Sequence, residues 1–155
     1  MSGFIINLAT LAAGASRLET RATAEELQLL PSEWPEGVDA TLELDRSGEL
    51  VAIRGHLRYT ARLDCVRCLN AFDLPIGVDM TMVADRAAGG SRLEADLEAD
   101  RYMMFHDGRQ LDLREEARES LLLELPITPH CREDCRGLCP RCGADLNEGP
   151  CGCPA

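Results

Sequence analysis

Eight cysteines constrain this chain more than any other feature, and six of them lie between Cys131 and Cys153. The first residues contain no basic start followed by a long apolar run, which indicates a cytoplasmic protein in a reducing compartment. Cysteines in such a compartment serve as metal ligands or redox groups more often than as disulfide partners. Their clustering favours a metal.

The most specific pattern is the turn Cys139-Pro-Arg-Cys142-Gly143. Two ligands separated by two residues can hold one zinc ion from a tight turn, and the glycine after the second cysteine permits a positive φ angle. A short loop then leads to two more cysteines separated by Gly152. So short and polar a tail cannot bury enough surface to fold without a metal. We therefore expect a C-terminal zinc ribbon, and the alternative is that its last cysteine is a spectator. The four expected ligands are Cys139, Cys142, Cys151 and Cys153.

The other four cysteines can form a second zinc site. Cys65 and Cys68 are again two residues apart and need two further ligands, for which Cys131 and Cys135 remain, with His130 as a substitute for one of them. Three interpretations stay open: a closed zinc site, an incomplete or empty site, and a redox dithiol at Cys65 and Cys68. A redox pair typically opens a helix, whose dipole lowers the thiol pKa, whereas strand patterns continue on both sides here. We expect two zinc ions per chain.

The rest of the chain has the 45% hydrophobic and 28% charged content of a globular protein. Alternating residues predict a hairpin over 41–45 and 50–64, and a returning strand over 72–83 that Pro75 places near an edge. Shorter strands are expected over 4–8 and 102–105. Trp34 is either a core residue or an anchor for a partner. Residues 85–100 have no periodicity and are interpreted as an acidic loop.

Two helices are expected. Thr23 and Glu26 have capping-box spacing, which predicts a short helix ending at Leu30 before Pro31. The main helix is expected from Asp112 to Leu125, where four apolar residues recur at every fourth position. The prediction is an α+β fold: a curved antiparallel sheet with one main helix and a C-terminal zinc ribbon. We divide it into an α+β body over residues 1–130 and a zinc-binding module over residues 131–155.

The formal charge is −11 and every basic residue is arginine, which argues against indiscriminate binding of nucleic acid. Residues 51–70 reverse this balance, with four arginines against one aspartate. Three of these arginines share one face of the predicted strand and are candidate partner contacts; the alternative is a solvated face neutralised by nearby acids. They are Arg54, Arg58 and Arg62.

Nothing in the sequence indicates an enzyme. His56, His106 and His130 lie in different settings, with His56 and His106 expected to be solvated, and no nucleophile elbow, Walker loop or dinucleotide fingerprint is present.

Three segments together resemble the YceD-type family, bacterial proteins implicated in the accumulation of large-subunit ribosomal RNA. They are the Cys65-Val-Arg-Cys68-Leu69 turn, Leu125-Pro-Ile-Thr-Pro129, and Cys131 to Asn147 with its four cysteines. The resemblance covers roughly residues 50–153 and implies a non-catalytic role in ribosome production. We expect a zinc-binding protein that assists ribosome biogenesis, with a ribosomal protein or ribosomal RNA as partner and neither a membrane nor a small-molecule substrate. Two alternatives stay open: a zinc-stapled adaptor unrelated to ribosomes, and a thiol redox protein acting through Cys65 and Cys68.

Overall fold

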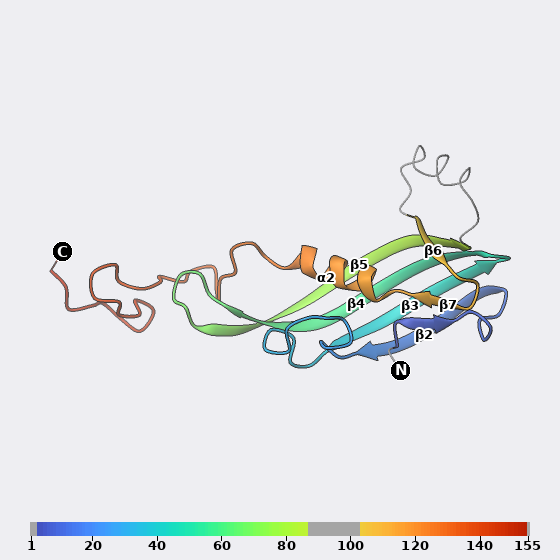
Figure 1. Ribbon diagram of the computed structural model, residues 1–155. Helices are drawn as coiled ribbons and strands as arrows, with labels where there is room; N and C mark the ends of the chain where they lie inside the picture. The colour runs from blue at the N-terminus through green and yellow to red at the C-terminus, as the bar shows by residue number, and fades with distance from the viewer. Residues whose placement is uncertain (1–2, 87–102, 155) are drawn as a thin grey trace.

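The computed structural model describes residues 3–86 and 103–154, and its main element is a long five-stranded sheet (Figure 1). The strands follow the order β2–β3–β4–β5–β6. All neighbours pair antiparallel except β5 and β6, which run parallel. The bounds are Gly14–Ala22 for β2, Val38–Ser47 for β3, Leu50–Asp64 for β4, Ala71–Arg86 for β5 and Met103–His106 for β6.

A two-stranded sheet and one helix complete the regular structure of the described residues. Strand β1 (Ile5–Asn7) pairs antiparallel with β7 (Gln110–Asp112), and helix α2 (Arg114–Glu124) follows β7 directly. The sheet outweighs the helix, so the fold is more β than the α+β class expected, and it is mostly rather than wholly antiparallel. The described helix is too short to span a bilayer.

The hairpin of β4 and β5 forms as the alternating pattern predicts. Along β4, residues from Val51 to Ala61 alternate between buried and solvent-facing positions. The ladder continues without interruption to the pair Asp64–Ala71, so the turn over residues 65–70 stands at the very end of the sheet. Among the described residues Pro75 pairs only with β4, since the pairing of β5 with β6 begins at Val83, and this part of β5 is the edge that the proline predicted.

One sheet face carries the core, and α2 lies across it (Figure 1). The predicted helical stripe packs there, with Leu113, Ala117 and Leu121 fully buried. The hydroxyl of Tyr59 in β4 donates to the carbonyl of Leu121 at 3.3 Å, which joins sheet and helix. Trp34 is a core residue: it is 1% exposed, and its ring centroid lies 4.3 Å from that of Tyr59.

The helix expected from Thr23 to Leu30 is absent, and residues 24–28 form a turn instead. Its capping box does form, because the Thr23 N–H donates to the Glu26 carboxylate at 2.8 Å and the Glu26 N–H donates to the Thr23 hydroxyl at 3.2 Å. Gln28 then takes a positive φ of 54°, and Pro31 follows closely. One turn is too short to repay the cost of helix nucleation.

The main helix begins at Arg114 with Leu113 at its cap, two residues later than expected. Asp112 belongs to β7 instead, although its carboxylate still accepts the Arg114 N–H at 3.1 Å. Of the predicted acidic loop, Asp85 and Arg86 belong to β5, and residues 87–100 lie outside the described residues.

His106, expected to be solvated, is only 5% exposed and lies within hydrogen-bond distance of Glu49 O, at 2.8 Å, and of Gly108 N, at 3.0 Å. His56 is exposed as expected, with Nδ1 2.6 Å from a carboxylate oxygen of Asp79.

The C-terminal residues extend from α2 past the tip of the β4–β5 hairpin, where they leave the sheet (Figure 1). Their only described strand-like pairing is the isolated bridge between Leu138 and Asp145. The division into residues 1–130 and 131–155 stays a prediction.

Candidate metal centres

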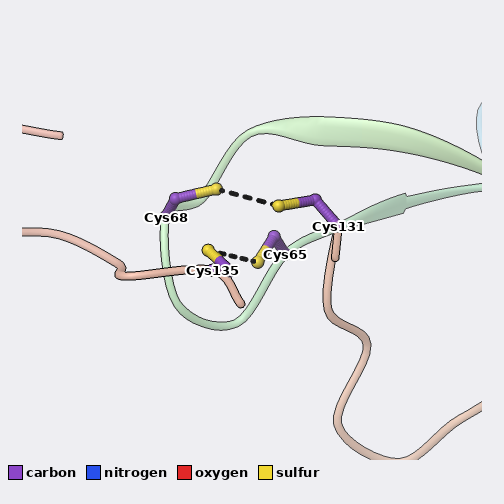
Figure 2. Close-up of side chains that lie close together, drawn as sticks. All are labelled: Cys65, Cys68, Cys131 and Cys135. Carbon is purple, nitrogen blue, oxygen red and sulfur yellow. Dashed lines mark hydrogen bonds between the residues drawn. The ribbon is translucent and has the colours of Figure 1, made fainter. Parts of the chain in front are cut away.

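The turn at the hairpin tip carries the first pair of cysteines. The Cys65 N–H donates to the Asn70 carbonyl and the Leu69 N–H donates to the Cys65 carbonyl, both at 2.9 Å. Leu69 has a φ of 61°, in the left-handed region that leucine rarely adopts. These bonds close a compact loop with Cys65 and Cys68 both turned inward (Figure 2).

The turn at Cys139 repeats this geometry. The Cys139 N–H donates to the Ala144 carbonyl at 2.8 Å, and the Gly143 N–H donates to the Cys139 carbonyl at 2.9 Å. Gly143, at the position of Leu69, has a φ of 74°. This local repeat was not predicted from the sequence, although both turns share the pattern Cys-x-Arg-Cys.

The first group of four sulfurs joins the hairpin tip to the chain after α2 (Figure 2). All four Sγ atoms lie within 4.8 Å of one another, including two contacts of 3.7 Å. Three of the four cysteines are buried, and Cys65 is completely enclosed. The Val66 N–H donates to the Pro129 carbonyl at 2.9 Å, which brings the two segments together. The members are Cys65, Cys68, Cys131 and Cys135.

The second group lies wholly within the C-terminal tail. Its four Sγ atoms also fall within 4.8 Å of one another, and those of Cys139 and Cys151 are 3.5 Å apart. This group is more open, because only Cys139 is buried and Cys142 is exposed. The members are Cys139, Cys142, Cys151 and Cys153, and among the described residues His130 joins neither group.

Both groups have the dimensions of a tetrahedral thiolate site. A zinc–sulfur bond of about 2.3 Å places tetrahedral sulfurs about 3.8 Å apart. The sulfur contacts of 3.5 and 3.7 Å are close to this value, whereas a disulfide would need about 2.05 Å. All eight cysteines are free thiols. The residues present therefore fit a metal ion in each group, and they are the same two sets that the sequence analysis grouped.

Backbone amides favour ionised sulfur most strongly at Cys65 and at Cys139. At Cys65 burial raises the pKa, but hydrogen bonds from the amides of Cys68, Cys131 and Arg67 outweigh it and lower the pKa to about 6. At Cys139 the backbone N–H groups of Cys142 and Arg141 lower the pKa to about 6. Thiolates at both positions suit metal ligation.

Other sulfurs of the two groups resist ionisation, most strongly those of Cys131 and Cys153. The pKa of Cys131 rises to about 12 through burial and the nearby Cys135. The pKa of Cys153 rises to about 11, chiefly through its hydrogen bond with Cys142. Thiolates packed this closely repel one another, and a divalent cation at the centre offsets the repulsion.

A polar network that the sequence analysis missed joins the two groups. The Asn147 amide Nδ2 donates to the Cys135 sulfur at 3.4 Å and to Asp145 Oδ1 at 2.9 Å. The other Asp145 oxygen accepts from the Asn70 amide on the hairpin turn at 3.0 Å. Asp145 and Asn147 belong to the loop between the cysteine pairs of the second group, so this loop supports the first group directly. The pattern Asp-x-Asn, typical of a loop that bonds its own backbone, was the available signal.

The three arginines proposed as partner contacts lie on the exposed face of β4, but acids stand beside them. In the strand register Glu43 of β3 opposes Arg54, and Asp39 of β3 opposes Arg58. Asp73 of β5 forms an ion pair with Arg62 at 3.1 Å. The face is thus a mosaic of both charges rather than a continuous positive surface. The arginines are Arg54, Arg58 and Arg62.

Several known proteins are similar in sequence to this chain. An uncharacterized protein of Mycobacterium tuberculosis is 30% identical, with the match covering 80% of this chain and 58% of that protein. An uncharacterized protein of Mycobacterium leprae is 28% identical over 77% of this chain and 54% of its own length. The chloroplastic protein of Arabidopsis thaliana described as large ribosomal RNA subunit accumulation protein YCED homolog 1 is 26% identical over 90% of this chain and 54% of its own.

The chain therefore spans little more than half the length of these relatives. No solved structure matches it. Residues 53–155, well over half of the chain and including all eight cysteines, match the family described as large ribosomal RNA subunit accumulation protein YceD, and the chain belongs to that family.

Proposed function

We propose that this chain is a non-catalytic protein with two structural Zn²⁺ ions that assists the accumulation of large-subunit ribosomal RNA. The observation that carries the metal assignment is the gathering of eight sulfurs into two four-sulfur groups of tetrahedral size. Four thiolates complete the coordination of zinc, whereas a catalytic zinc keeps one position for water or substrate. Zinc, when bound, would add a strong cross-link to the hydrogen bonds that already join the hairpin tip to the tail.

The first group would fasten the chain after α2 to the hairpin tip. Cys65 and Cys68 are the hairpin's ligands, and Cys131 and Cys135 are those of the tail. The second group would fold the tail itself, which has one strand-like bridge and little apolar surface. A redox role is less well supported, because Cys65 is completely enclosed and a redox thiol must reach its oxidant or reductant.

The ribosomal part of the proposal is supported by the family's description and by the name of the Arabidopsis relative. A charge of −11 suits a basic ribosomal protein better than RNA, because the acidic surface attracts the former and repels the latter. We place this activity in the cytoplasm. The mosaic around Arg58 on β4 would add contacts to acidic groups of the partner.

Ribosome profiles of a strain depleted of this protein test the ribosomal role. We expect large subunits to fall and the intact chain to restore them, whereas a Cys65→Ser, Cys68→Ser double variant should not. Unchanged large-subunit levels on depletion would favour an adaptor unrelated to ribosomes. Rapid alkylation of Cys65 or Cys68 in zinc-loaded protein would favour the redox alternative.

A further inference from the structure

Three exposed apolar residues lie close together in the sequence where α2 ends. Leu122 is 39% exposed, Leu123 is 86% exposed and Ile127 is 98% exposed. Single apolar residues at a surface are ordinary, but three within six positions, two of them almost fully in water, indicate a surface that a partner covers. We define the α2-end surface as Leu122, Leu123 and Ile127 together with Glu119 and Glu124.

Leu123 and Ile127 are not buried against the core of the described residues. The buried residues of α2 are Ala117 and Leu121, and Leu122 and Leu123 are not among them. Ile127 lies in the short segment 125–129, which is hydrogen-bonded at both ends. Leu125 N–H donates to the Leu122 carbonyl at 3.4 Å, and the Pro129 carbonyl accepts from Val66 at 2.9 Å. Prolines 126 and 129 stiffen this segment, so displaying Ile127 costs a partner little ordering entropy.

Two exposed acidic residues, Glu119 and Glu124, lie in the C-terminal half of the same helix. The C-terminus of a helix carries the negative end of its dipole and favours cations, yet the last turn of α2 contains no basic residue and its final residue is Glu124. Glu119 is exposed one turn earlier. The pKa of Glu116 is raised by burial and then by the charges of neighbouring acids, Glu119 among them, which agrees with a negative potential along the helix.

Exposed apolar side chains and acids near a helix C-terminus both lower stability, and both occur at the end of α2. Such a combination is typical of a binding surface. We propose that the α2-end surface docks a basic protein segment that carries apolar anchor side chains. Cations of the partner would neutralise Glu119, Glu124 and the helix end, while its anchors cover Leu123 and Ile127. RNA would meet repulsion here, and a second copy of the chain would oppose glutamates to glutamates. This inference rests on the proposed function and specifies the chemistry of its partner.

The full zinc-loaded chain can be tested with a fluorescent amphipathic peptide of lysine and leucine. We expect binding that weakens at higher salt and falls by about tenfold or more in a Leu123→Ser, Ile127→Ser variant and in a Glu119→Gln, Glu124→Gln variant. Leu30→Ser, at another leucine that is 60% exposed, and Glu49→Gln, in the turn between β3 and β4, are matched controls that should leave affinity within about twofold.

Equal binding by both α2-end variants and their controls would overturn the proposal. So would equal binding of a peptide with glutamate in place of lysine, equal competition by an RNA oligonucleotide, or a dimer in sedimentation that Leu123→Ser and Ile127→Ser abolish. The variants change only exposed side chains, so their thermal unfolding should match the parent chain. If depletion leaves ribosomes unchanged but these variants still lose the peptide, the ribosomal role fails while the docking surface stands.

Discussion

Asn147 offers the sharpest test of how the polar network supports the first metal group. Its side-chain Nδ2 donates to the Cys135 sulfur and to Asp145 Oδ1, and its side-chain Oδ1 accepts from the Arg136 N–H and from the Arg132 side chain, both at 2.8 Å. The substitution Asn147→Asp keeps the shape and the accepting oxygen. It replaces the donating amide with a negative oxygen beside a thiolate and beside the Asp145 carboxylate.

The expected loss follows from these contacts. Removing a group that hydrogen-bonds a metal ligand lowers metal affinity by about 10–100-fold, or about 1.4–2.8 kcal/mol. Because the substituted oxygen also repels the sulfur, we expect Asn147→Asp to lie near the upper end of this range. Only the group containing Cys135 should be weakened directly, since Asn147 makes no described contact with a sulfur of the other group.

Competition with a chromophoric zinc chelator measures both sites. The parent chain should release two zinc ions, and Asn147→Asp should give up one of them at a markedly lower chelator concentration. Glu148→Gln is the control, because it removes an exposed charge at the next residue and should leave both affinities unchanged. Identical release curves for Asn147→Asp and the parent chain would refute the reasoning.

Three further predictions concern the tail, the hairpin turn and the buried Tyr59. Chelation should leave the far-UV strand signal and the buried Trp34 fluorescence intact while residues 131–154 become protease-sensitive, because the main core contains no cysteine; loss of the sheet on chelation would contradict this. Leu69→Gly should stabilise the zinc-loaded chain by about 0.5–1 kcal/mol in urea unfolding. A leucine in the left-handed region costs about 1–2 kcal/mol, and the larger conformational entropy that glycine loses on folding offsets part of the gain. Val66→Gly in the same turn should be destabilising, and equal effects of the two would argue against strain at Leu69. The pKa of Tyr59 is raised to about 12 by burial and then by Glu124, so its contribution to stability is complete below pH 10 and lost as the pH rises towards 12. Tyr59→Phe should flatten the fall in urea midpoint across this interval, and a parallel fall in both proteins would count against it.

The cysteine turns were predictable because their geometry is local. A Cys-x-x-Cys turn needs only six residues, and the four ligands of the C-terminal tail lie within 15 residues of one another. The first group could be predicted only by combining the cysteines that remained, since nothing in the sequence near Cys65 indicates that Cys135 is its neighbour. The long strand β4 was equally accessible, because its one-sided burial imposes strict alternation.

The misses have long-range or context-dependent causes. Strand β2 is an edge strand, largely exposed, so its residues show little apolar alternation. The capping box at Thr23 formed without a helix, because a cap lowers the cost of starting a helix but does not supply the turns that follow. The contact between Asn147 and Cys135 depends on how the tail folds over the hairpin tip, which propensity and spacing do not encode.

Metal content combined with the zinc X-ray absorption spectrum tests the central claim most directly. Protein prepared without chelators or oxidants should contain two zinc ions per chain, each surrounded by four sulfurs at about 2.3 Å. A preparation with no bound transition metal and eight freely titrating thiols, yet with residues 131–154 still protected from protease, would contradict the account.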